Sequence, residues 1–306
     1  MKVVITDCDH PNVDTERQIF AKAGLGTELA SCHTADDVIA AGQGAVALLT
    51  QYAPVTAQVL DALPGCRAVG RYGAGVDNID VAAARARGVA VISVPDYSLE
   101  EVANQTIALI LAVTRGIVGL HDSVRAGRWD FRAAGPLRRA SEQVLGVIGL
   151  GHIGAAVASR ARALGFAVAG HDPMQSVPGV TQLPLPELLS TSDIITLHAP
   201  LTPGTRHLLN DDTFALMKPG AVVVNTARGG LVDTAALRRA LGAGRIGGAA
   251  LDVTDPEPPE PGDPLLRDSR VIVTPHAAFY SEESLAELKR RAADGLVAAI
   301  SSHSGQ

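Results

Sequence analysis

Aromatic side chains are scarce in this sequence, where Phe, Trp and Tyr make up 3% of the 306 residues. Buried cores must therefore be built from Ala, Val, Leu and Ile, which suits parallel sheets covered by helices. The chain has only three cysteines, Cys8, Cys32 and Cys66, and no CxxC pair. This number and spacing argue against a disulfide framework and against a metal site, and indicate reduced thiols.

Long apolar runs and basic blocks are also missing. The longest apolar candidate, Val102–Val113, is interrupted by three polar residues, so no segment approaches the ~18 uninterrupted apolar residues of a membrane helix. The apolar run at the N-terminus is too short for a signal peptide. The formal net charge is −6 without a basic cluster, which argues against nucleic acid as a partner. Together these features predict a soluble, cytoplasmic protein.

Short apolar runs alternate with amphipathic helical stretches, in a chain long enough for two domains of about 100–200 residues each. This βαβ rhythm predicts parallel sheets, and the first ~98 residues suffice for one small α/β unit. Strands are predicted there at Val3–Thr6, Val46–Leu49, Ala68–Gly70 and Val89–Ile92, and helices at Asp14–Ala23, Thr56–Leu63 and Val81–Arg87.

A long helix is predicted from Leu99 or Glu100 to about Ala126, with Ser98 as its cap and Glu101 completing a capping box. Six further strands with helices between them would make a full dinucleotide-binding domain. Their ranges are Val144–Ile148, Ala167–Gly170, Ile194–Leu197, Ala221–Asn225, Gly248–Leu251 and Val271–Thr274. The acidic, proline-rich stretch Asp255–Pro264 predicts a loop, and a final helix is expected at about Glu282–Ile300.

A glycine fingerprint links the first of these strands to an alanine-rich helix. Gly149 permits a tight turn, Gly151 lets backbone approach a pyrophosphate, and Gly154 lets helix and strand pack closely. Between them, His152 and Ile153 open the helix, whose N-terminal N–H groups can face phosphate. The alternative is a glycine turn with a purely structural role.

Asp172 ends the following strand, 18 residues after the last glycine of the fingerprint. A carboxylate at this position can accept hydrogen bonds from both ribose hydroxyls and would repel a 2′-phosphate. The sequence therefore favours NAD over NADP as the cofactor.

Three residues near the C-terminal end carry candidate chemistry. The guanidinium of Arg228, which precedes two glycines, can hold a carboxylate with two parallel hydrogen bonds. His276 follows a strand, and a carboxylate such as Glu257 would stabilise its protonated form. Together they could bind a 2-oxo acid and protonate its carbonyl oxygen. Taken singly, each has a structural alternative: a surface arginine, a structural histidine and an exposed acid.

A second anion site is predicted at Gly73, Ala74 and Gly75. Consecutive backbone N–H groups with little side chain form a nest suited to a carboxylate. The alternative is a tight turn that ends a strand.

The chain resembles the D-isomer-specific 2-hydroxyacid dehydrogenase family over nearly its whole length. The resemblance implies that Arg228 binds substrate, that Glu257 pairs with the histidine and that His276 is the acid/base. The motifs that carry it are Arg71–Asp80 (RYGAGVDNID), Leu145–Gly154 (LGVIGLGHIG), Asn225–Asp233 (NTARGGLVD), Gly248–Val253 (GGAALDV) and Thr274–His276 (TPH).

The resemblance also implies an α/β protein of two domains. A Rossmann NAD-binding domain would span residues 99–283, and a discontinuous, flavodoxin-like substrate domain would combine residues 1–98 and 284–306. The active site would lie in the cleft between them.

Further cofactor contacts follow from the resemblance alone. It places Ala199, Pro200 and Thr205 along the adenosine and pyrophosphate side. Thr226 and Ala227 would flank the nicotinamide ribose. Asp252 would accept a hydrogen bond from the carboxamide.

Within the family, Thr274–Ser281 looks most like the C-terminal-binding-protein branch, whose members are NAD-linked and dimeric. This branch places a substrate-binding arginine at Arg71. Phe279 stands where the animal corepressors carry a tryptophan, which suggests a bacterial-type enzyme and leaves the substrate open. Gln51 and Tyr52 are further candidates for substrate selectivity.

The hypothesis is an NAD-dependent, homodimeric D-2-hydroxyacid dehydrogenase that reduces a small 2-oxo acid with NADH. An NAD(H)-sensing, corepressor-like binding protein is the alternative, although a sensor does not need Arg228, Glu257 and His276 together. A formate- or phosphite-type dehydrogenase is disfavoured. Formate enzymes of the family carry Gln at the position of Glu257, and a phosphite enzyme would want a lysine near Ala74.

Overall fold

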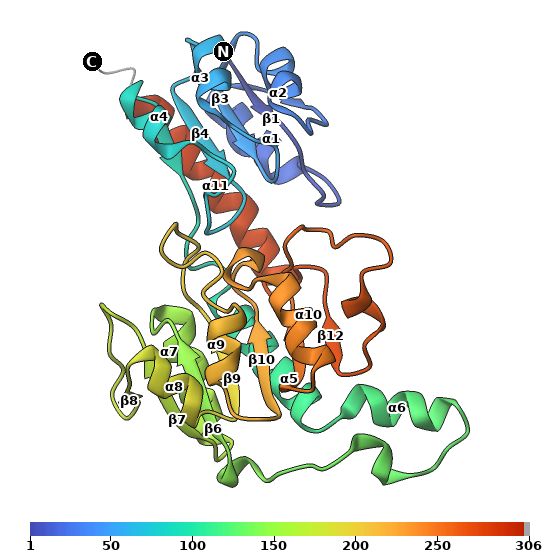
Figure 1. The fold of residues 1–306 in the computed structure, drawn as a ribbon. Helices are drawn as coiled ribbons and strands as arrows, with labels where there is room; N and C mark the ends of the chain where they lie inside the picture. Colours follow the sequence, from blue (N-terminus) through green and yellow to red (C-terminus); the bar gives the residue numbers. More distant parts are fainter. Residues whose placement is uncertain (303–306) are drawn as a thin grey trace. The chain divides into compact units, whose positions relative to one another are not determined.

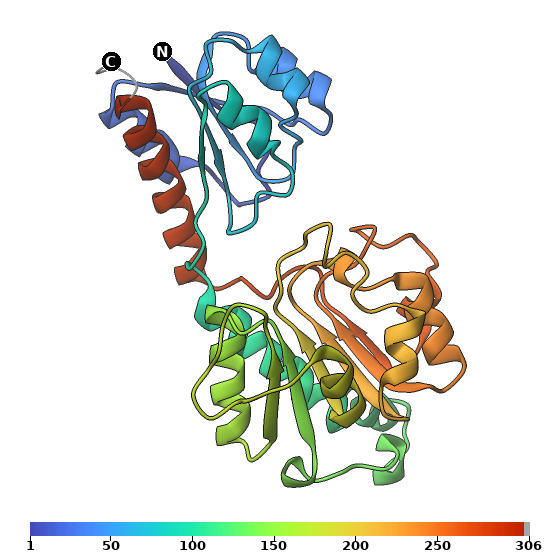
Figure 2. The same ribbon diagram turned by 60° about the vertical axis from the view of Figure 1, so that its left-hand side comes forward.

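The computed structural model describes residues 1–302, which form two compact units. Unit 1 comprises Met1–Tyr97 together with the chain from Ser281 onward, and unit 2 comprises Ser98–Tyr280. Each unit is a parallel sheet with helices on both faces (Figures 1 and 2).

Unit 1 contains a five-stranded parallel sheet in the order β2-β1-β3-β4-β5. This order is that of flavodoxin-like folds, so the predicted fold of this part is confirmed. The strands are β1 (Lys2–Ile5), β2 (Gly26–Leu29), β3 (Ala45–Thr50), β4 (Ala68–Arg71) and β5 (Ala90–Ile92). The helices are α1 (Asp14–Lys22), α2 (Ala35–Ala41), α3 (Ala57–Ala62), α4 (Val81–Ala86) and α11 (Glu282–Ser302).

The two faces of this sheet pack against different helices. On one face, Phe20 of α1 and Leu288 and Leu296 of α11 share a core with the strands. On the other face, a second core contains Val38 of α2 and Val59 of α3. The central strands are buried on both sides, which explains their near-continuous apolar sequence.

Unit 2 contains a seven-stranded parallel sheet in the order β12-β11-β10-β9-β6-β7-β8. Its strands are β6 (Val144–Ile148), β7 (Ala167–His171), β8 (Thr181–Gln182), β9 (Ile194–Leu197), β10 (Ala221–Asn225), β11 (Ile246–Leu251) and β12 (Val271–Val273). Its helices are α5 (Leu99–Thr114), α6 (Ile117–Arg125), α7 (His152–Ala163), α8 (Leu185–Thr191), α9 (Asp211–Leu216) and α10 (Thr234–Gly242), with short 3₁₀ turns η1 (Phe131–Ala134), η2 (Ala140–Glu142), η3 (Gly229–Leu231) and η4 (Pro264–Arg267).

The strand order of unit 2 reverses between β6 and β9. The chain runs from β6 outward to β7 and β8, then returns to β9 on the other side of β6. Ligands of open α/β sheets bind outside the carboxyl ends of the strands at such a switch point. The glycine fingerprint follows β6 and therefore lies at this position.

The prediction of a single long helix from about Leu99 to Ala126 is wrong, because two helices, α5 and α6, occupy this stretch. The helix is broken between α5 and α6 because Gly116 adopts a left-handed conformation with φ of 59°. Ser98 does occupy the N-cap position of α5, but its side chain makes no capping hydrogen bond. The sequence did not predict strands β2 and β8 or helix α2. Both strands are short and mostly exposed, so neither contains the apolar run by which a buried strand is recognised.

Judged by length and hydropathy, no single helix within residues 1–302 could cross a membrane. One pair, α5 with α6, passes the same test when taken together and is bent by 59°.

A buried ionic cluster joins three elements of unit 1. Glu16 of α1 is fully buried and accepts a hydrogen bond from Tyr72 Oη, with an O···O distance of 2.8 Å. Lys289 of α11 places its Nζ 3.7 Å from the other carboxylate oxygen of Glu16 and donates to the carbonyl oxygen of Asn12. Burial makes this cluster sensitive to the loss of either charge.

We expect Lys289→Met to destabilise unit 1 by about 3–5 kcal/mol, because the Glu16 charge would stay buried without its partner. Hydrogen exchange of the amides in β1, β3 and β4 measures this loss within unit 1. Arg290→Met is the matched control, since Arg290 pairs with Asp294 on the exposed side of the same helix. Equal protection in both variants would contradict a stabilising role for the buried pair.

Candidate active site

The turn after β6 has the geometry of a dinucleotide-binding loop. Gly149 has a φ of 91°, and a Cβ atom there would lie 2.6 Å from the backbone nitrogen of Ala199. A Cβ atom on Gly154 would overlap the carbonyl oxygen of Gly149. Nothing lies within 4 Å of the position of a Cβ on Gly151, so a ligand can approach the backbone at this point. Helix α7 begins at His152, with Ile153 next, and opens toward the same turn.

Asp172, directly after β7, is tied to this turn. Its Oδ2 accepts a hydrogen bond from the backbone N–H of Leu150 at 2.8 Å, and its Oδ1 accepts from the N–H groups of Met174 and Gln175. Burial alone would raise the pKa of Asp172, but these three hydrogen bonds outweigh it and lower the pKa. The residue therefore presents a carboxylate, not a carboxylic acid, beside the glycine turn.

The other expected cofactor residues follow neighbouring strands. Ala199 and Pro200 come after β9, and Thr226 and Ala227 come directly after β10. All lie beyond the carboxyl ends of β9, which pairs with β6, and of β10, which pairs with β9, on the same edge as the glycine turn. Thr205 stabilises the Pro200 loop, since its hydroxyl donates to the Pro200 carbonyl oxygen at 2.6 Å.

His198, between β9 and Ala199, has a structural role in this loop. Its Nε2 lies 3.0 Å from the hydroxyl of Thr196, and burial lowers its pKa to about 3. The ring is therefore neutral at physiological pH and is not an acid/base candidate. Within residues 1–302, no cluster of three or more His, Cys, Asp or Glu is arranged to hold a metal ion.

His276 and Glu257 are in direct contact. The Nδ1 atom of His276 lies 2.5 Å from Oε1 of Glu257, and both side chains are about one third exposed (31% and 38%). Since Glu257 occupies Nδ1, the opposite ring nitrogen, Nε2, is the one that can exchange a proton with a ligand. Phe279 packs edge-to-face near the imidazole, with ring centroids 6.4 Å apart.

Asp252 fixes the loop that carries His276. Its carboxylate is buried and accepts hydrogen bonds from the Thr274 hydroxyl at 2.5 Å and from the N–H groups of Ala277 and Ala278 at 3.0 and 2.8 Å. Its carbonyl oxygen accepts from the N–H of His276 at 2.8 Å. The sequence indicated an unusual acid at the end of β11, but it did not indicate that this acid holds the His276 loop. A contact between Asp252 and the nicotinamide carboxamide stays a prediction.

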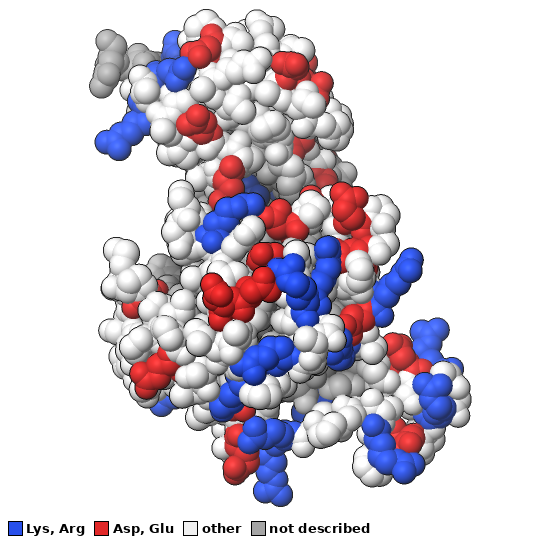
Figure 3. All heavy atoms as spheres, viewed as in Figure 1, with Lys and Arg blue, Asp and Glu red and all other residues white. Residues whose placement is uncertain are grey.

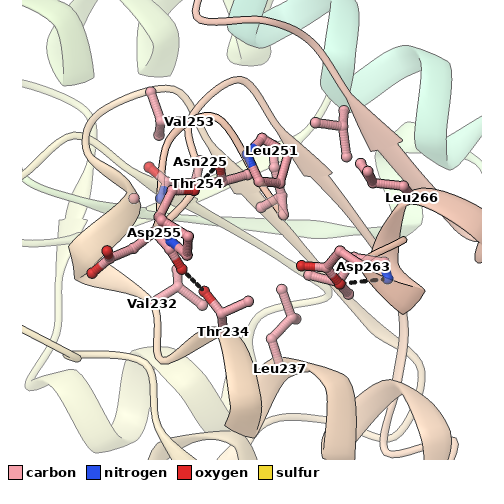
Figure 4. Close-up of a pocket in the computed structure, with 15 residues that line it drawn as sticks. Asn225, Val232, Thr234, Leu237, Leu251, Val253, Thr254, Asp255, Asp263 and Leu266 are labelled. Carbon is pink, nitrogen blue, oxygen red and sulfur yellow. Dashed lines mark hydrogen bonds between the residues drawn. The ribbon is translucent and has the colours of Figure 1, made fainter. Parts of the chain in front are cut away.

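Arg228 lies on a turn packed against the chain that leads to Glu257. A Cβ atom on the next residue, Gly229, would overlap the carbonyl group of Thr254, so only glycine allows this close approach. Figure 4 shows the pocket beneath this contact, where Thr234 Oγ1 donates to the Asp255 carbonyl oxygen at 2.9 Å. The turn of Arg228 and the loop of Glu257 are thus held together within unit 2.

The Gly73–Gly75 turn of unit 1, where an anion site was predicted, is packed closely against Arg71. Gly73 has a φ of 136°, and a Cβ atom there would overlap the guanidinium of Arg71, so this side chain folds over the glycine. Ala74 is exposed, and Gly75 follows it in the same turn. The Arg71 guanidinium and this turn therefore lie together just after β4, and an anion site formed by their N–H groups stays a prediction.

Comparison with known proteins agrees with this geometry. Residues 107–278 match the family described as D-isomer specific 2-hydroxyacid dehydrogenase, NAD binding domain. The chain is 40% identical over 262 residues to a glyoxylate reductase of Korarchaeum cryptofilum, covering 83% of this chain and 78% of that protein. The solved D-lactate dehydrogenase from Aquifex aeolicus, complexed with NAD and lactic acid, superimposes with a TM-score of 0.87 at 29% identity, covering 99% and 95% of the two chains.

A D-3-phosphoglycerate dehydrogenase of Methanocaldococcus jannaschii is 39% identical over 291 residues. The match covers 93% of this chain, which spans about half the length of that relative (54%).

The chain belongs to the D-isomer specific 2-hydroxyacid dehydrogenase family. It is an NAD-dependent oxidoreductase that acts on 2-hydroxy acids. The predicted family, two-part α/β fold and cofactor are confirmed. The narrower assignment to the C-terminal-binding-protein branch stays a prediction.

We expect Asp172→Ala to weaken NADH binding at least about tenfold, through lost hydrogen bonds to the ribose and a loosened Leu150 turn. NADPH binding should change far less, because the same substitution removes the charge that repels a 2′-phosphate. Titration of cofactor fluorescence measures both constants. Equal losses for the two cofactors would rule out the ribose contact.

Proposed function

We propose that this protein is a D-2-hydroxyacid dehydrogenase that reduces a small 2-oxo acid, with His276 as the proton donor. The observation that carries the proposal is the contact of 2.5 Å between His276 Nδ1 and Glu257 Oε1 in the unit that binds NAD. This contact holds the imidazole in one orientation, as a general acid requires.

The residues present fit the cofactor. We assign the open backbone at Gly151 and the start of α7 to the pyrophosphate, and Asp172 to the ribose. When bound, NADH supplies the hydride for C2 of the substrate. We propose residues 99–283 as the cofactor domain, and residues 1–98 with 284–306 as the substrate domain.

Two cationic groups are assigned to the substrate carboxylate. In unit 2, Arg228 can hold it with two parallel hydrogen bonds. In unit 1, Arg71 and the backbone N–H groups of Gly73, Ala74 and Gly75 add further contacts. The carbonyl oxygen of the substrate then receives a proton from Nε2 of His276 as C2 receives the hydride. In the reverse direction, the same nitrogen takes the proton from the hydroxyl group.

Membership of the family does not specify the substrate group that lies beyond C2, here called the far end of the substrate. Two relatives differ in the substrate for which they are named, since one is a glyoxylate reductase and the other a D-3-phosphoglycerate dehydrogenase. The choice between an unphosphorylated and a phosphorylated acid has to be made by side chains of this chain.

We expect His276→Ala to lower kcat for reduction by about 10²- to 10⁴-fold, because general acid catalysis is lost. NADH affinity, measured by fluorescence, should be unchanged. Steady-state assays with glyoxylate, hydroxypyruvate and pyruvate test both statements. Glu257→Gln should lower kcat by a smaller factor, since it removes the charge and keeps a polar partner. His33→Ala, an exposed histidine of unit 1, is the control. Full activity of His276→Ala, or no reduction by the natural protein, would refute the proposal.

We also propose that the protein is a homodimer that pairs through an arm of unit 2, defined as residues 117–139. This arm extends away from the sheet (Figure 1) and carries Trp129 and Phe131, which are 91% and 84% exposed. In a chain with so few aromatics, two highly exposed ones only two positions apart indicate an interaction surface.

The charge of the arm favours a second copy of the chain as its binding partner. The arm contains five arginines and two aspartates, whereas the whole chain has a net charge of −6. Arginine side chains are prominent on the arm, at the lower right of Figure 3. The remainder of the chain is therefore acidic, and another copy offers a surface of complementary sign.

We expect Trp129→Glu combined with Phe131→Glu to convert a dimer into a monomer, because two charges would be buried at the apolar centre of the interface. Light scattering after size-exclusion chromatography measures the mass. Met174→Glu, which alters another highly exposed apolar residue of unit 2, should leave the mass unchanged. A monomeric natural protein would contradict the proposal.

A further inference from the structure

Three adjacent strands of unit 1 present polar residues at one edge of the sheet. Strands β1, β3 and β4 are neighbours and run parallel, with Thr50 paired to Arg71. Asp7 and Asp9 follow β1, while Gln51 and Tyr52 follow β3. The side chains after β3 therefore lie next to the Arg71 end of β4, which is assigned to substrate binding.

The backbone of this edge is fixed by Asp7. Its buried carboxylate accepts hydrogen bonds from three consecutive N–H groups of the loop after β3, those of Gln51, Tyr52 and Ala53, at 3.1, 2.6 and 3.2 Å. The carboxylate also accepts from the Thr50 hydroxyl at 3.1 Å. The loop is thus held in one conformation, and its side chains are presented in a defined direction.

The side chains of the same loop are held by Asp9. Its Oδ1 accepts from Gln51 Nε2 at 2.5 Å, and its Oδ2 accepts from Tyr52 Oη at 2.9 Å. The N–H of Asp9 donates to Gln51 Oε1 at 3.0 Å, so both ends of that amide are used. Tyr52 Oη and one N–H of the Gln51 amide therefore donate to Asp9, and Gln51 is itself buried, with 4% exposure.

What remains available at this edge is a set of hydrogen-bond acceptors with a negative charge. The Asp9 side chain is 58% exposed and Tyr52 is 54% exposed. Burial and the charge of Asp9 raise the pKa of Tyr52, whereas the charge of Arg71 lowers it. The phenol thus stays protonated and keeps donating to Asp9, and it lies within the electrostatic reach of Arg71.

We propose that Asp9, Gln51 and Tyr52, here called the acceptor edge, select the far end of the substrate. The acceptor edge admits a 2-oxo acid whose C3 substituent is neutral or donates a hydrogen bond, such as a hydroxyl group. It disfavours one that ends in a phosphate or a second carboxylate, because such a group brings only acceptors and negative charge to Asp9. This assignment rests on the proposed function, in which Arg71 and the Gly73–Gly75 turn contact the substrate carboxylate.

The test compares hydroxypyruvate with its 3-phosphate, using NADH and measuring kcat/KM for each. The natural protein should prefer hydroxypyruvate by at least about tenfold, as expected for a dianion opposed by one nearby carboxylate. Asp9→Asn removes the charge and keeps the shape, and should reduce this preference about five- to tenfold. Asp14→Asn, an exposed acid at the start of α1, is the matched control and should leave the preference unchanged.

Glyoxylate separates selectivity from structural damage, because it has no C3 substituent to meet the acceptor edge. Any loss of glyoxylate reduction in Asp9→Asn measures damage to the loop, and the change in preference between hydroxypyruvate and its 3-phosphate should exceed that loss. The proposal is overturned if the natural protein reduces the phosphorylated acid as well as hydroxypyruvate, if Asp9→Asn leaves the preference intact, or if this variant loses glyoxylate reduction equally. If the natural protein reduces none of the three acids, the proposed function fails instead.

Discussion

Carboxylates placed just beyond strand ends determine how the functional loops of this protein are held. Asp7 after β1, Asp172 after β7 and Asp252 after β11 each accept hydrogen bonds from two or more backbone N–H groups of loops at the same edge of their sheets. A carboxylate can accept about four hydrogen bonds, so one side chain can immobilise several residues of a loop. This arrangement supplies the rigidity that a site built on loops needs.

Each of these carboxylates holds a different loop. Asp172 holds the glycine turn against which the cofactor would lie, and Asp252 holds the loop of His276. Asp7 does the same for the acceptor edge, although none of its partners is a catalytic candidate.

Much of this organisation could be predicted from the sequence, and the reasons differ from element to element. The glycine fingerprint and the strand and helix that flank it are local patterns, so they predict both the turn and the class of ligand that it binds. The break at Gly116 is equally local, but a glycine inside an apolar helical stretch does not by itself show a left-handed conformation. Strand β2 escaped prediction because it lies at the edge of the sheet and is mostly exposed. The contacts of Asp7 and Asp9 join residues 42 to 46 positions apart. No spacing in a single sequence indicates such partners.

The backbone of His276 shows what the Asp252 hydrogen bonds achieve. His276 has a φ of 52°, a left-handed conformation that costs a residue with a side chain about 1–3 kcal/mol. An isolated loop would relax from it, and the imidazole would then swing away from Glu257. Hydrogen bonds from Thr274, Ala277 and Ala278 to the Asp252 carboxylate fix the chain on both sides of the histidine. The strain is therefore offset by the buried carboxylate of Asp252, and the imidazole is held with its Nδ1 atom 2.5 Å from Oε1 of Glu257. For the proton transfer proposed for His276, such preorganisation means that the acid does not have to be assembled during the reaction.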